Sequence, residues 1–244
     1  MEVMRSWQPT LDIEDFRALR EQFTDFMLGY KFAIDEITTK INILREDFNA
    51  VHEYNPIEHI NSRLKAPESV LEKVRRKNYG MNLASIRENV LDIAGVRVTC
   101  SFISDIAKIR DMLVDQEDIT LLDERDYITN RKPNGYRSLH LIVSIPVFRS
   151  DRTDRIPVEI QIRTIAMDFW ASLEHKIYYK YRGEVPPNLQ GELTEAAEAA
   201  AALDEKMESL HHLVDHNGKP RPAPADSLDL SALYLGFLGR SGPN

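Results

Sequence analysis

Hydrophobic residues recur at two different spacings along this chain. Between residues 12 and 48 they return every three or four positions, as at Phe23, Phe26 and Tyr30, which is the period of an amphipathic helix. From Val96 to Ser101 apolar and polar residues alternate instead, which is typical of a strand with one buried face. The pattern therefore predicts helix first and sheet later.

The same reading predicts the other elements. Strands are expected at 96–101, 119–123, 138–147 and 156–163, and helices at 12–48, 67–78, 83–90, 104–115, 164–181 and 189–214. Helices, then a mixed sheet, then helices indicate an α+β domain. We divide the chain into an N-terminal helical element (1–50), a sheet domain (51–185), a C-terminal helix (186–215) and a flexible tail (216–244).

Composition narrows the class of protein. The chain has 244 residues, 43% of them hydrophobic and 29% charged, which is an ordinary balance for a soluble globular protein. No apolar run approaches the ~20 residues that a membrane helix needs. The single cysteine, Cys100, excludes an internal disulfide, so we expect a cytoplasmic protein without membrane contact. A net charge of −8 argues against a general nucleic-acid coat, but it leaves room for a local basic site.

One segment is strongly basic. Six cations fall within fifteen residues: Arg63, Lys65, Lys73, Arg75, Arg76 and Lys77. On the predicted helix Ser69, Lys73 and Arg76 share a face, and Ser69 lies in the first turn, where free N–H groups favour an anion. The segment has the chemistry of a polyphosphate clamp, and a solvated basic helix face explains it equally well.

Polar side chains also follow the predicted sheet. Asp92 directly precedes a strand that carries Arg97, and Glu159 and Gln161 occupy the polar face of another strand, with His140 on the strand between. Two carboxylates among cations would make a magnesium and phosphate site. The alternatives are a turn aspartate and a half-exposed strand.

Two further segments are of interest. In the loop Arg131–His140, Gly135 permits a tight turn, Tyr136 offers a ring on which a base could stack, and Lys132 and His140 could reach phosphate, although a plain hairpin loop would look the same. In the helix after the last strand, we expect Trp170 to lie in the core.

Taken together, the order and spacing of these motifs are specific. They are Arg63-Leu-Lys65, Asp92-Ile-Ala-Gly-Val-Arg97, Lys132-Pro-Asn-Gly-Tyr-Arg-Ser-Leu-His140, Val158-Glu-Ile-Gln-Ile-Arg163 and Trp170-Ala-Ser-Leu-Glu-His175. Over about residues 50–181 the set resembles the synthetase domain of the RelA/SpoT family, and the short chain resembles the single-domain small alarmone synthetases. The resemblance implies a nucleotidyltransferase-like mixed sheet of about five strands.

The resemblance also implies a reaction: the β,γ-pyrophosphate of ATP moves to the 3′-hydroxyl of GTP or GDP, giving pppGpp or ppGpp and AMP. It assigns ATP to Arg63, Lys65, Ser69, Lys73, Arg76 and Arg97, with adenine between the two arginines. It assigns GTP or GDP to Arg125, Lys132, Tyr136, His140, Gln161, Asp168 and Ala171, with guanine on the tyrosine. Asp92 and Glu159 would hold Mg²⁺, and Glu159 would be the general base.

Relatives of this kind also suggest a homo-oligomer, in particular a tetramer. The chain has no His-Asp dipeptide, so we expect no activity of the hydrolase site found in the long bifunctional relatives.

Two other functions remain open at this stage. One is a catalytically silent nucleotide- or RNA-binding regulator that retains the pocket, although a pure anion binder would not keep two acidic positions there. The other is a nucleotidyltransferase acting on RNA, which usually carries an Asp-x-Asp pair that Thr99–Asp105 lacks. Nucleic acid is not an expected partner, but regulation by RNA stays open.

Overall fold

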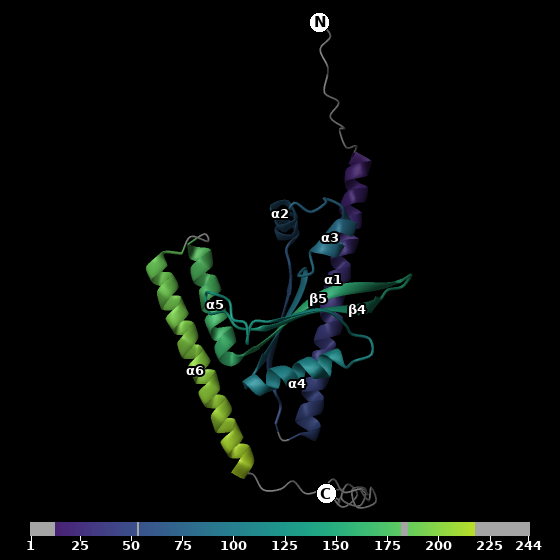
Figure 1. The fold of residues 1–244 in the computed structure, drawn as a ribbon. Helices are drawn as coiled ribbons and strands as arrows, with labels where there is room; N and C mark the ends of the chain where they lie inside the picture. The colour runs from purple at the N-terminus through teal and green to yellow at the C-terminus, as the bar shows by residue number, and fades with distance from the viewer. Residues whose placement is uncertain (1–12, 53, 182–184, 218–244) are drawn as a thin grey trace, which may run out of the picture. The chain divides into compact units, whose positions relative to one another are not determined.

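The computed structural model describes residues 13–52, 54–181 and 185–217, and Figure 1 shows their arrangement. The helices are α1 (Ile13–Val51), α2 (Pro67–Lys77), α3 (Leu83–Asn89), α4 (Ile103–Val114), α5 (Ile165–Lys180) and α6 (Pro187–Asn217). The strands are β1 (Ile57–Leu64), β2 (Ala94–Cys100), β3 (Thr120–Asp126), β4 (Leu139–Phe148) and β5 (Thr153–Thr164). The predicted α+β class is confirmed.

The chain divides into one compact unit that ends at Leu210 and a second that begins at His211. Of the predicted tail, 216 and 217 end α6 rather than form a loop, and 218–244 lies outside the described residues. The four-part division made from the sequence otherwise stays a prediction. None of the helices in the described ranges is long and apolar enough to cross a membrane.

The strands form a single mixed sheet in the order β1-β2-β5-β4-β3. β2 and β5 run parallel, and the other neighbours are antiparallel. The hydrophobic pattern predicted four of these strands and missed β1. In this edge strand Ile57 is the one buried residue, so the apolar alternation that identifies a half-buried strand is absent.

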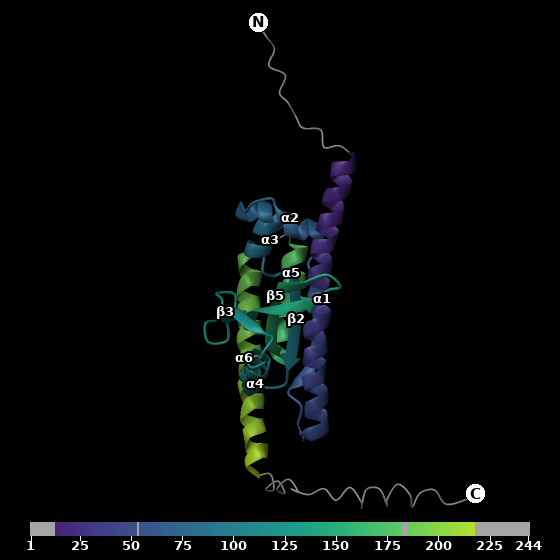
Figure 2. The same ribbon diagram turned by 90° about the vertical axis from the view of Figure 1, so that its right-hand side faces the viewer.

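One face of the sheet carries the hydrophobic core. Ile37 and Ile41 of α1 are fully buried in the same cluster as Val98 and Ile160 of the central strands, and α4 adds Ile109. Figure 2 shows α1 running along one side of the sheet. Because alternate residues of a strand point to opposite faces, this packing leaves the polar side chains of β2, β4 and β5 on the other face.

The loop between β3 and β4 is held against α6. Gly135 has a φ of +86°, and a Cβ atom there would lie 2.4 Å from the Cβ of Ala197. Trp170 of α5 donates from Nε1 to the carbonyl of Leu193 at 2.8 Å, and Tyr136 packs against this small cluster. The two C-terminal helices therefore support the segment that presents Tyr136.

Asp204 of α6 is a buried carboxyl, 6% exposed, that accepts a hydrogen bond of 2.8 Å from Thr164. Burial raises its pKa above the ordinary value of 3.8, and this effect outweighs the hydrogen bond from Thr164. The ionised form therefore weakens the docking of α6 on the rest of the unit.

We expect Ile37→Ala to lower the free energy of unfolding by about 2–5 kcal/mol, because it leaves a cavity under the sheet. Ile43 lies on the same helix but is 59% exposed, and Ile43→Ala should cost less than about 0.5 kcal/mol. Urea denaturation followed by circular dichroism measures both, and equal losses would show that α1 does not pack as described.

Asp204→Asn should keep more of its stability than the native chain as the pH rises above the ordinary pKa of 3.8. In the native chain the folded state binds the proton more tightly than the unfolded state, so the free energy of unfolding falls as the pH rises through the raised pKa. The uncharged amide still accepts from Thr164 and carries no such loss. Melting temperatures between about pH 4 and pH 7.5 test the prediction, with Glu198→Gln, an exposed glutamate of the same helix, as the control. Parallel curves for Asp204→Asn and the native chain would refute it.

Candidate active site

A row of polar residues crosses all five strands on the face away from the core. The register pairs Asn61 with Arg97, Arg97 with Gln161, Gln161 with His140, and His140 with Arg125. Directly paired residues point to the same side of a sheet. The last four of these positions had been predicted as site residues, and the sheet brings them onto one surface.

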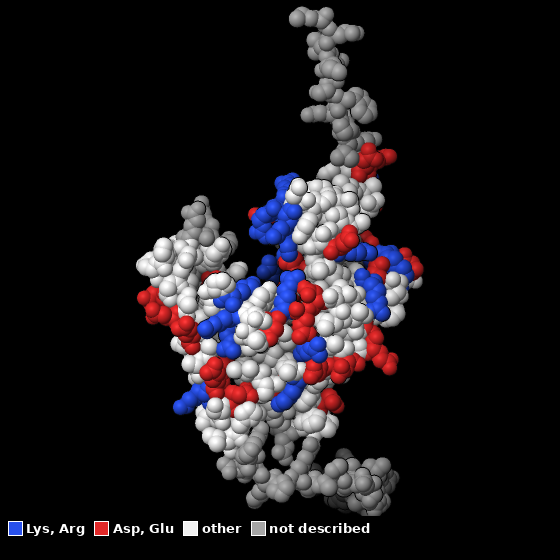
Figure 3. Space-filling view, viewed as in Figure 1, with Lys and Arg blue, Asp and Glu red and all other residues white. Residues whose placement is uncertain are grey.

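A pocket of about 500 Å³ opens on this face, within the range of small-molecule sites. Its charged and amide-bearing lining comprises Asn61, Arg63, Lys65, Asp92, Arg97, Glu159 and Gln161. Figure 3 shows Lys and Arg side chains gathered around a hollow between α2 and α5. The two carboxylates proposed from the sequence thus lie in one pocket, although they come from distant parts of the chain.

Two lysines hold Asp92 in the loop before β2. Lys65 Nζ lies 2.6 Å from one carboxylate oxygen and Lys73 Nζ lies 2.7 Å from the other. Burial alone would raise the pKa of Asp92, but these contacts outweigh it and hold that pKa below its ordinary value. Asp92 is therefore ionised at neutral pH.

Glu159 on β5 is also held through both of its oxygens. His140 Nδ1 lies 3.1 Å from Oε1, and Gln161 Nε2 donates to Oε2 at 3.0 Å. Burial raises the pKa of Glu159, but the contacts with His140 and Gln161 prevail and lower it overall. The result is an ionised carboxylate with fixed orientation, which is the form that can accept a proton.

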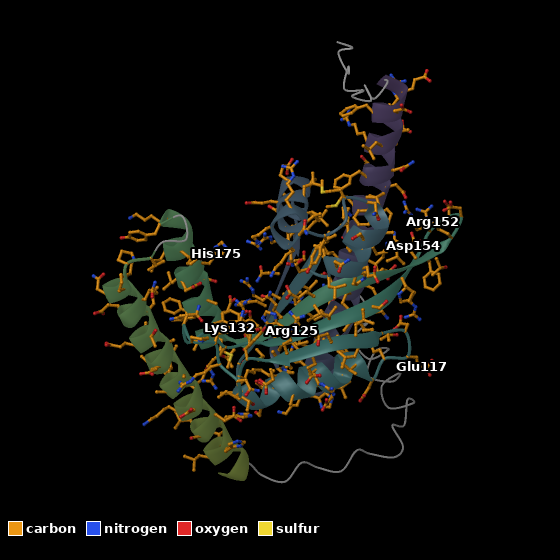
Figure 4. All side chains as sticks on the ribbon, turned by 45° about the horizontal axis from the view of Figure 1, so that its top comes forward. Glu117, Arg125, Lys132, Arg152, Asp154 and His175 are labelled. Atoms are coloured by element: carbon orange, nitrogen blue, oxygen red, sulfur yellow. The ribbon has the colours of Figure 1, made fainter. Side chains whose placement is uncertain are left out.

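Aromatic rings surround His140, which contacts the pocket residue Glu159 from the β3–β4 side. Tyr136 Oη lies 2.7 Å from His140 Nε2, and the ring of Tyr127 packs edge-on against both side chains. The ammonium group of Lys132 lies 4.5 Å from the centre of the Tyr127 ring and 4.9 Å from that of Tyr136. Figure 4 labels Lys132 and Arg125, the latter on β3. A basic group thus sits beside a flat aromatic surface.

Arg163 connects these groups, and the sequence reading did not select it as a site residue. It is 4% exposed and donates to Tyr136 Oη at 2.6 Å and to Gln161 Oε1 at 2.7 Å. Asp168 lies beside it, with Oδ1 at 3.3 Å from Arg163 Nη1 and 3.0 Å from Arg97 Nη1. The alternation of β5 places Arg163 on the same face as Glu159 and Gln161, and this was the signal that could have found it.

The remaining predicted site residues have less specific surroundings. Ser69 is half-buried in the first turn of α2, and Arg63 and Arg76 are exposed nearby. Arg125 forms an ion pair of 2.7 Å with Asp123. Ala171 is 7% exposed in the cluster with Trp170, where it supports Tyr136.

The oxygen ligands in this pocket are suited to a hard cation that is also coordinated by a substrate. Within the described ranges no three His, Cys, Asp or Glu side chains gather as a ready-made metal site. Asp92 and Glu159 supply two carboxylates in one pocket, and Mg²⁺ is commonly bound by one or two carboxylates together with phosphate oxygens. These residues therefore fit Mg²⁺ that arrives with a nucleotide.

Comparison with known proteins gives a consistent answer. Residues 62–184 match the family model described as a region found in RelA / SpoT proteins. The chain is 49% identical over 203 residues to GTP pyrophosphokinase YwaC of Bacillus subtilis (strain 168), which covers 83% of this chain and 97% of that protein.

Solved structures agree. The small alarmone synthetase 2 from Bacillus subtilis superposes with a TM-score of 0.72 at 50% identity, covering 78% of this chain and 98% of that one. The small alarmone synthetase 1 from the same organism, bound to its product pppGpp, gives a TM-score of 0.74 at 40% identity, covering 80% and 98%. The chain therefore belongs to the RelA/SpoT family, and within that family it resembles the small alarmone synthetases.

Proposed function

We propose that this chain is a GTP pyrophosphokinase that transfers the β,γ-pyrophosphate of ATP to the 3′-hydroxyl of GTP or GDP. The observation that carries the proposal is the meeting of Asp92 and Glu159 in one pocket lined by Lys65 and Arg97. Moving a pyrophosphate between two polyanions needs cations, a metal and a base within reach of one another. The similarity to proteins named GTP pyrophosphokinase supports the same reaction.

On the donor side, the guanidinium planes of Arg63 and Arg97 would enclose adenine. Both residues line the pocket, and the buried Nε of Arg97 has no hydrogen-bond partner within the described part of the chain. Lys65 and Lys73 lie close enough to Asp92 to turn from it to the ATP phosphates, together with Ser69 and Arg76 at the first and third turns of α2. Exchange of one anion for another keeps each lysine neutralised.

On the acceptor side, guanine would stack on Tyr136, with its edge toward Asp168 and Ala171. Arg125, Lys132, His140 and Gln161 would position the phosphates and ribose. Glu159 would take the proton of the 3′-hydroxyl as that oxygen attacks the β-phosphorus. The bond from the β-phosphorus to the bridging oxygen of AMP breaks, and AMP leaves with that oxygen. The 3′-hydroxyl is a weak nucleophile, so it requires acidic and basic groups that are fixed in position.

Asp92 and Glu159 would hold Mg²⁺ in this scheme. When bound, the ion would neutralise charge on the β- and γ-phosphates. The steps above require side-chain movements only: Lys65 and Lys73 exchange Asp92 for phosphate, and Lys132 moves from the Tyr136 ring to the acceptor nucleotide.

The proposal extends to the setting of the enzyme. We place it in the cytoplasm, where both nucleotides occur, acting as a homotetramer without hydrolase activity. Ile165, Phe169 and Leu173 form an exposed apolar stripe along α5, which supports self-association. No observation favours the alternative of a silent nucleotide- or RNA-binding regulator.

Incubation of the purified chain with γ-labelled ATP, Mg²⁺ and GDP or GTP should give labelled ppGpp or pppGpp together with unlabelled AMP. Thin-layer chromatography separates the products. Chelation of the metal should abolish synthesis, because the pocket provides only two carboxylates and relies on phosphate to complete the coordination. Release of the label as free pyrophosphate when RNA is added, or binding of both nucleotides without any product, would refute the proposal.

Glu159→Gln should bind both nucleotides but lose turnover by about 10²–10⁴-fold, because the amide keeps the shape and cannot accept the proton. Glu117→Gln is the matched control: this glutamate is exposed in the turn between α4 and β3 and is labelled in Figure 4. Steady-state rates and calorimetric nucleotide binding test the pair. Turnover of Glu159→Gln at the native rate would remove Glu159 from the role of base.

A further inference from the structure

Arg163 is the point where two chains of hydrogen bonds begin. Its Nη2 donates both to Gln161 Oε1 at 2.7 Å and to Tyr136 Oη at 2.6 Å. Its guanidinium carbon also lies 5.1 Å from the centre of the Tyr136 ring. One buried nitrogen therefore fixes a neighbour on its own strand and the aromatic ring of the β3–β4 loop.

Both chains of hydrogen bonds end on Glu159. Along the first, Gln161 Nε2 donates to Glu159 Oε2 at 3.0 Å. Along the second, Tyr136 Oη meets His140 Nε2 at 2.7 Å, and His140 Nδ1 meets Glu159 Oε1 at 3.1 Å. The five side chains close a ring that holds each oxygen of the carboxylate from a different side.

The chemistry of the ring members sets a direction for the protons. An arginine has only donors, so Tyr136 Oη accepts from Arg163. Its own proton can then go to Nε2 of a neutral His140, whose Nδ1–H donates to Glu159. In this order every contact has one donor and one acceptor, and Glu159 keeps the negative charge.

Arg163 is too fully engaged to bind a nucleotide itself. Nε donates to Ser138 Oγ at 3.4 Å, Nη1 to Asp168 Oδ1 at 3.3 Å and Nη2 twice, so four of its five N–H groups are in use. The side chain is also 4% exposed. Its effect on the reaction must therefore pass through the side chains that it holds.

We infer that Arg163 is a positioning residue that locks the stacking ring of Tyr136 and the base Glu159 into one rigid unit. The inference rests on the proposed function, because it takes those two roles as given. A lysine could reach one or two of the partners but lacks the planar fork that reaches Ser138, Asp168, Gln161 and Tyr136 at once.

Kinetics of three variants and one double variant test the inference. They are Arg163→Met, Arg163→Lys, Tyr136→Phe and Arg163→Met combined with Tyr136→Phe, assayed for kcat and for the KM of GDP at saturating ATP and Mg²⁺. Arg163→Met should lower kcat/KM by about 30-fold or more, since it leaves several buried polar groups without a donor. Arg163→Lys should recover part of the loss. In the Tyr136→Phe background the same change should cost at least about threefold less, because one arm of the ring is already broken.

Donor binding separates positioning from general damage to the fold. The affinity for α,β-methylene ATP, whose scissile bridge is blocked, should stay within about threefold in Arg163→Met by calorimetry. Arg149→Met is the matched control: Arg149 is also largely buried, but it pairs with Asp25 and Asp154. Figure 4 labels Asp154 on the β4–β5 hairpin, away from Lys132. This control should lower the melting temperature without raising the KM of GDP.

Three results would overturn the inference. The first is a native kcat/KM in Arg163→Met, and the second is additive effects of Arg163→Met and Tyr136→Phe. The third is a lowered melting temperature in Arg163→Met together with equal losses of donor and acceptor binding. If Arg163→Met does not fold, Tyr136→Phe and Gln161→Leu each break one arm of the ring, and native kcat in both would refute it. Absence of product from the native chain is a different outcome, since it rejects the proposed function rather than Arg163 alone.

Discussion

The site depends on neutralising the negative charge of two carboxylates on a half-buried surface of the sheet. Asp92 and Glu159 lie in one pocket, where each raises the cost of ionising the other and burial adds to that cost. Each is nevertheless ionised, because two partners hold its oxygens: lysines for Asp92, and an imidazole and an amide for Glu159. The rest of the fold serves to bring those partners together from α2, β1, β4 and β5.

The two carboxylates are neutralised in different ways, and this difference matches their roles. Lys65 and Lys73 are long, flexible and partly exposed, so they can exchange Asp92 for a phosphate at little cost. The partners of Glu159 are held by the sheet, since His140 lies on the neighbouring strand β4 and Gln161 lies on β5 itself. The donor side is thus built for exchange of partners, whereas the base is built for a constant orientation.

The sequence was sufficient for the features that depend on local periodicity. Alternation around Ile160 placed Glu159 and Gln161 on the polar face of β5, and helical spacing located α2 with its lysine. It did not reveal β1, whose edge position removes the apolar alternation, nor the importance of Arg163. Arginine on a strand is usually solvated, and only the tertiary packing of Tyr136 and Asp168 shows that this one is enclosed.

Because Gly135 lies against Ala197, α6 limits where the β3–β4 loop can lie. The loop that carries Tyr136 approaches the helix so closely that a Cβ atom at position 135 would lie 2.4 Å from the Cβ of Ala197, which is itself buried. Volume at position 197 is therefore a remote determinant of where the aromatic ring stands, although this alanine touches no polar group of the pocket. A small-to-large exchange on this helix would shift the ring while leaving Asp92 and Glu159 untouched.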